Sequence, residues 1–74
     1  MDEVERLALE REVREHLAAV EELGAALREL EEAAEQLAEP SKDLKRQISA
    51  IRGEIRGRMA AIALGEARLG VDPF

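Results

Sequence analysis

The side chains that could do chemistry in this sequence are mainly carboxylates, arginines and one histidine. Carboxylates stand in adjacent pairs at Glu21 and Glu22 and at Glu31 and Glu32, which are residue types suited to general acid and base catalysis. Catalysis also needs groups that converge in a pocket, and an alanine-rich helical chain offers none. We therefore interpret these pairs as solvated helix surface and predict that the protein is not an enzyme.

Metal and cofactor chemistry has little support in the sequence. There is no cysteine, and His16, the only histidine, cannot form a zinc site alone. We expect no metal and no cofactor. His16 falls among leucines in a heptad pattern, so we interpret it as a core or near-core residue; the alternative is a pH-sensitive element at an oligomer seam.

Charge divides the chain into two parts. Residues 1–39 hold 13 acidic and 4 basic residues, a net charge of −9, whereas residues 40–74 hold 7 basic and 4 acidic residues, a net charge of +3. We expect the two parts to attract each other, with an acidic protein partner as an alternative. A further alternative is contact with nucleic-acid phosphates through the cations of the second part, but the overall charge of −6 and the absence of stacking aromatics argue against it. Those cations are Lys42, Lys45, Arg46, Arg52, Arg56 and Arg58.

Two helices account for these residues. Strong helix formers predict a first helix over about 2–39, ended by Pro40, because the residue before a proline is driven out of the helical region. Ser41 is a good N-cap, which predicts a turn at 40–41, a second helix over about 42–69 and a tail at 70–74. So short a connection makes the helices antiparallel neighbours. The predicted fold is all-α: one domain over residues 1–74, an antiparallel hairpin of two unequal helices that forms an oligomeric helical bundle.

The unequal lengths leave part of the first helix uncovered. We expect residues 2–12 to overhang the second helix, with Val4, Leu7 and Leu9 unpaired. A lone chain of this size rarely gathers more than about 3 to 5 kcal/mol of stability from its own core. Oligomerisation or a partner is therefore the expected source of further stability.

The first helix has one heptad seam, and small residues widen it. Alanines at the g positions extend the apolar surface beyond that of a two-stranded coil, which indicates a bundle. The seam comprises Leu9, Val13, His16, Val20, Leu23, Leu27, Leu30 and Leu37.

The second helix is apolar on two opposite sides. A seam of large residues, interrupted by Arg58 and Gly65, comprises Leu44, Ile48, Ile51, Ile55, Ile62 and Leu69. Small residues dominate the other face, which comprises Ala50, Gly53, Gly57, Ala60, Leu64 and Ala67. The first helix can cover only one of these faces, so we expect a second chain on the other. The alternative is that the glycines only weaken the helix and the small face meets water.

The C-terminal residues Asp72, Pro73 and Phe74 resemble the tail peptide with which bacterial single-stranded-DNA-binding proteins dock onto their partners. This resemblance implies a docking motif. The alternative is that Phe74 folds back and caps the hydrophobic end of the bundle. The unequal hairpin as a whole resembles bacterial and phage adaptors that dimerise into bundles.

These features predict a non-catalytic interaction or assembly subunit whose partner is a second copy or a larger protein assembly. The alternative is a small acidic regulator, of phage or stress type, that docks on a nucleic-acid-processing enzyme. We expect a cytoplasmic protein, or a virion component if a phage encodes it, and we expect it to bind neither nucleic acid nor membranes. The preference for arginine over lysine is typical of a GC-rich and thermophilic source.

Overall fold

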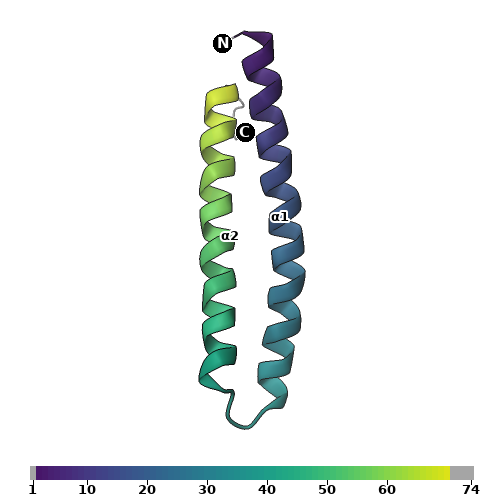
Figure 1. Cartoon of the computed structure of the whole chain (residues 1–74), viewed down its shortest axis with the longest axis vertical. Coiled ribbons are helices and arrows are strands. Elements are labelled where there is room, and N and C mark those ends of the chain that lie inside the picture. Colours follow the sequence, from purple (N-terminus) through teal and green to yellow (C-terminus); the bar gives the residue numbers. More distant parts are fainter. Residues whose placement is uncertain (1, 71–74) are drawn as a thin grey trace.

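Two helices packed side by side make up the computed structural model, which describes residues 2–70 (Figure 1). Helix α1 spans Glu3–Gln36 and helix α2 spans Lys42–Leu69, joined by residues 37–41. The chain reverses direction between them, so the helices are antiparallel. The predicted all-helical hairpin of unequal helices is confirmed, and residues 2–70 contain no strand.

Polar residues cap the helix ends. The Asp2 carboxylate accepts a hydrogen bond from the Glu5 amide at 2.8 Å, and the Ser41 hydroxyl accepts one from the Leu44 amide at 3.1 Å. Each bond satisfies an amide that the first turn leaves without a helical partner. At the far end of α2, Gly70 adopts a left-handed conformation with φ +74°, which glycine reaches without steric cost. These local signals explain why α2 has the predicted bounds.

The end of α1 differs from the prediction. The helix stops at Gln36, three residues before Glu39, and Leu37 is already extended. Pro40 drives only the residue before it, Glu39, out of the helical region, so the proline alone does not explain an end at Gln36. Residues 37–39 leave the helix and form part of the connection. Leu37, placed in the α1 seam by its heptad position, is instead a helix cap that is 51% exposed.

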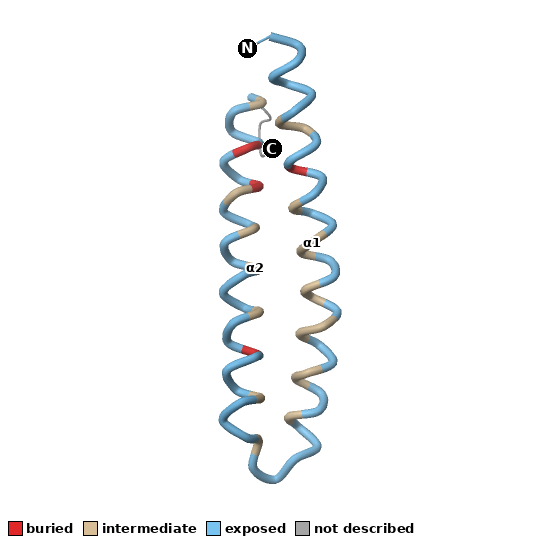
Figure 2. Tube along the Cα trace, viewed as in Figure 1, coloured by how far each residue is buried: buried red, intermediate tan, exposed pale blue. Residues whose placement is uncertain are grey.

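The molecule is a rod with a thin core. It extends over 55 × 21 × 16 Å and has a radius of gyration of 16.2 Å, against about 11 Å for a compact domain of this length. Buried and half-buried residues line the facing sides of the helices, while the outer sides are exposed (Figure 2). Only Val13, Ile48 and Ile62 form the buried hydrophobic core within residues 2–70, and each keeps 8 or 9% of its surface exposed.

Candidate interaction site

The large-residue seam of α2 lies against α1. Ile48 and Ile62 are buried, and the other four members, Leu44, Ile51, Ile55 and Leu69, are half-buried. On α1 the seam residues from Leu9 to Leu30 are buried or half-buried as well. The two seams therefore form the interface of the hairpin itself, and they are not the surface that a further partner meets.

Gly65, which interrupts the α2 seam, lies at a close approach between the helices. A Cβ atom at this position would lie 2.7 Å from Cγ2 of Val13, so no side chain fits without displacing Val13. Gly65 is buried, and Val13 is one of the three core residues. The glycine thus belongs to the hairpin interface, where it lets the helices come together.

Arg58, the other interruption, crosses to His16. Its guanidinium Nη1 donates a hydrogen bond to His16 Nδ1 at 3.2 Å in a partly buried position. The same guanidinium lies 3.7 Å from the Glu54 carboxylate through Nη2. His16 is thus a half-buried residue of the interface, as its heptad position predicts. The contact between Arg58 and His16 was not predicted. Both are polar residues within otherwise apolar seams, and that pattern could have suggested the contact.

Among residues 2–70, one direct ion pair joins the acidic helix α1 to the basic helix α2. Arg52 Nη2 lies 3.7 Å from Glu31 Oε1, with both side chains about half exposed. Such a pair contributes at most about 1 kcal/mol. Glu21, Glu22 and Glu32 are exposed. Lys42, Lys45 and Arg56 form no ion pair with any described residue, so their charge is available to a partner.

The predicted small-residue face of α2 is fully open. All six of its members are exposed, and we call this surface the outer face of α2: Ala50, Gly53, Gly57, Ala60, Leu64 and Ala67. Leu64 is 60% exposed, and its neighbour Met59 is 57% exposed. A Cβ atom on Gly53 or Gly57 would meet no other atom within 4 Å. Nothing in the hairpin therefore requires glycine at these two positions.

The first turns of α1 extend past the end of α2 (Figure 1). Val4 is 76% and Leu7 52% exposed, and a shallow groove on this segment is lined by α1 residues alone, namely Val4, Leu7, Ala8 and Arg11. Leu9 is half-buried. The overhang therefore ends before Leu9 rather than at Glu12, because α1 finishes earlier at the turn than predicted.

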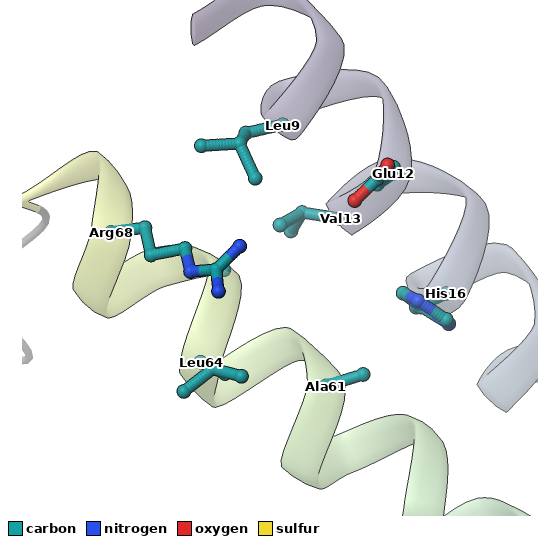
Figure 3. A pocket seen from close by; sticks show the side chains of 8 residues that line it. Leu9, Glu12, Val13, His16, Ala61, Leu64 and Arg68 are labelled. Carbon is teal, nitrogen blue, oxygen red and sulfur yellow. The ribbon is translucent and has the colours of Figure 1, made fainter. Parts of the chain in front are cut away.

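A groove of about 140 Å³ opens between the helices near the end of α2 (Figure 3). Leu9, Glu12, Val13 and His16 come from α1, and Ala61, Leu64, Gly65 and Arg68 come from α2. A carboxylate, a guanidinium and the His16 imidazole share this lining with aliphatic side chains.

Comparisons with known proteins give no assignment: no protein-family model, curated protein or solved structure matches the chain. Neither α1 nor α2 is sufficiently long and apolar to cross a membrane. Among residues 2–70, no three acidic or histidine side chains gather to hold a metal ion. The predicted tail, Asp72, Pro73 and Phe74, lies outside the described residues.

Proposed function

We propose that the protein is a non-catalytic interaction and assembly subunit that binds other protein helices through the outer face of α2. One observation carries the proposal: α1 covers the large seam of α2, while the apolar face on the opposite side is left exposed. A helix that is apolar on two sides is normally packed on two sides.

The amount of exposed surface supports the proposal. The chain exposes 5993 Å², whereas a compact monomer of 8.2 kDa exposes about 4500 Å². The excess of about 1500 Å² is larger than the roughly 800 Å² that each partner buries in a standard interface. A subunit that associates in this way gains stability by mass action as its partner concentration rises.

Photocrosslinking tests whether this surface meets another protein. A benzophenone amino acid replaces Ala63, an exposed residue beside Leu64, and a matched variant carries it at Ala25, an exposed residue on α1. Irradiation in the cells that make the protein should give an adduct from position 63 and none from position 25. Leu64→Arg in the same chain should abolish that adduct.

The crosslinking results distinguish the proposed function from its alternative. An adduct at position 63 with the mass of two copies or with a foreign protein supports the proposal. A missing adduct at position 63, or equal adducts at both positions, contradicts it. An adduct to a foreign protein from position 25 alone favours the acidic regulator, because the surface of α1 carries most of the acidic residues.

A further inference from the structure

Contacts within the hairpin do not explain why positions 53 and 57 are glycine. Each interior glycine costs about 1 kcal/mol of helix stability relative to alanine, and a Cβ at either position would meet open space. At Gly65 the close approach of Val13 offsets this cost. A close approach by something outside the hairpin would offset it at Gly53 and Gly57.

We propose that the occupant of the outer face of α2 is the same face of a second copy, packed antiparallel, so that the two α2 helices lie between the two α1 helices. This inference rests on the proposed function and names its partner. In the register we assign, Ala50 faces Ala67, Gly53 faces Leu64, and Gly57 faces Ala60 of the second copy. The pairing is symmetric, as in a two-fold dimer.

Side-chain size favours this register over a parallel one. In the antiparallel pair every glycine meets a residue with a side chain, and Leu64 fills the space that Gly53 leaves. In a parallel pair Leu64 would meet Leu64, while Gly53 and Gly57 would each meet themselves. The two Leu64 side chains would then hold the helix backbones apart. Gaps would remain where Gly53 and Gly57 meet their own copies, and the van der Waals contacts of close packing would be lost there.

Charge favours the same arrangement. Because Val13 lies opposite Gly65, the first turn of α1 extends about six residues, or about 9 Å, beyond Leu69. This turn carries Glu3 and Glu5. In the assigned register Lys42 of the second copy lies equally far beyond Leu69, level with that acidic turn.

The basic end of α2 thus matches an acidic segment of the second copy along the rod axis. Lys42 and Lys45 form no ion pair with any residue that the structure describes, and both are exposed. A parallel pair would instead place the basic end of one α2 beside the same end of the other. Like charges so arranged repel, which disfavours the parallel orientation.

Disulfide trapping tests the orientation, since the chain has no cysteine that could interfere. Ala50→Cys and Ala67→Cys keep Gly53, Gly57 and Leu64 intact. The two full-length variants, one of them carrying a mass tag, are mixed and oxidised gently, and intact mass spectrometry counts the products. Ala25→Cys on α1 is the control for random collision.

The antiparallel dimer predicts at least tenfold more Ala50→Cys with Ala67→Cys heterodimer than either homodimer. Homodimers that exceed the heterodimer would show a parallel pair and overturn the inference. Products at the level of the Ala25→Cys control would also overturn it, because the second copy would then not be the occupant. In that case the photocrosslink at position 63 still tests the proposed function. An adduct with another protein at that position would support the proposed function with a partner other than a second copy.

Discussion

Gly65 and Gly53 are the same residue type in the same helix, but they should respond oppositely to an added methyl group. Gly53→Ala removes a helix-weakening glycine from open space and should raise the free energy of unfolding of the hairpin by about 0.5 to 1 kcal/mol. Gly65→Ala forces a Cβ against Val13, whose branched side chain has little rotamer freedom. Overpacking of this kind should lower that free energy by about 1 to 2 kcal/mol.

Urea denaturation followed by circular dichroism checks both values at a dilution where the chain is monomeric. Equal stabilisation by Gly65→Ala and Gly53→Ala would mean that Val13 moves aside at no cost. The assigned close approach of the helices would then be wrong.

The hydrogen bond between Arg58 and His16 places two polar groups in an otherwise aliphatic interface. Replacing both with leucine removes the cost of partly burying them and should stabilise the hairpin by about 1 kcal/mol, the lower end of the range for buried polar pairs. His16→Leu alone should be destabilising, because Arg58 keeps its partial burial while its Nη1 loses the His16 acceptor.

A double-mutant cycle measured by urea unfolding gives the coupling energy, which should reach at least about 0.5 kcal/mol for residues in direct contact. Additive effects of His16→Leu and Arg58→Leu would contradict the pairing.

At the scale of the elements, the overhang of α1 should be the least stable helical segment. Residues 3–8 have only exposed positions, whereas residues 19–31 include many that α2 covers. Helix ends without packing open with free energies near zero. Hydrogen exchange at low protein concentration should therefore be at least about tenfold faster in residues 3–8 than in residues 19–31. Uniform protection along α1 would contradict this view of the overhang.

Local signals explain which parts of the fold could be predicted from the sequence. Ser41 and Gly70 cap α2 through bonds within one turn, so its bounds were predictable. The heptad positions of α1 from Leu9 to Leu30 are buried or half-buried, whereas Leu37 is exposed. The end of α1 at Gln36 has no local signal in the sequence, because Pro40 restricts only Glu39. The contact between Arg58 and His16 depends on the register of the hairpin, so each residue was visible in the sequence but their pairing was not.

The candidate interaction site was also predictable only in part. The composition and spacing of the outer face of α2 predicted a second apolar side that another chain covers, and in the hairpin this face is exposed. Sequence alone could not decide which of the two faces α1 would cover. Burial of large side chains contributes more per residue than burial of alanine or glycine, so the hairpin uses the large seam.

At the scale of the whole molecule, self-association and hairpin stability should separate in one variant. Gly53→Leu combined with Gly57→Leu places two large side chains on the outer face of α2 without touching α1. Helix propensity then rises by about 1 kcal/mol at each position. The second copy, however, can no longer approach, because Leu64 would meet a leucine instead of a glycine. We expect at least a tenfold weaker dimer with equal or greater helicity.

Light scattering and thermal unfolding over a wide concentration range measure the two effects together. For the original chain the unfolding temperature should rise with concentration, because folding and association are linked. For the double variant that dependence should disappear, whereas Ala18→Leu with Ala25→Leu, exposed positions on α1, should retain it. A double variant that still dimerises would exclude close packing at the glycines. Loss of helicity in that variant would instead place Gly53 and Gly57 in the interior of the hairpin, against their open surroundings.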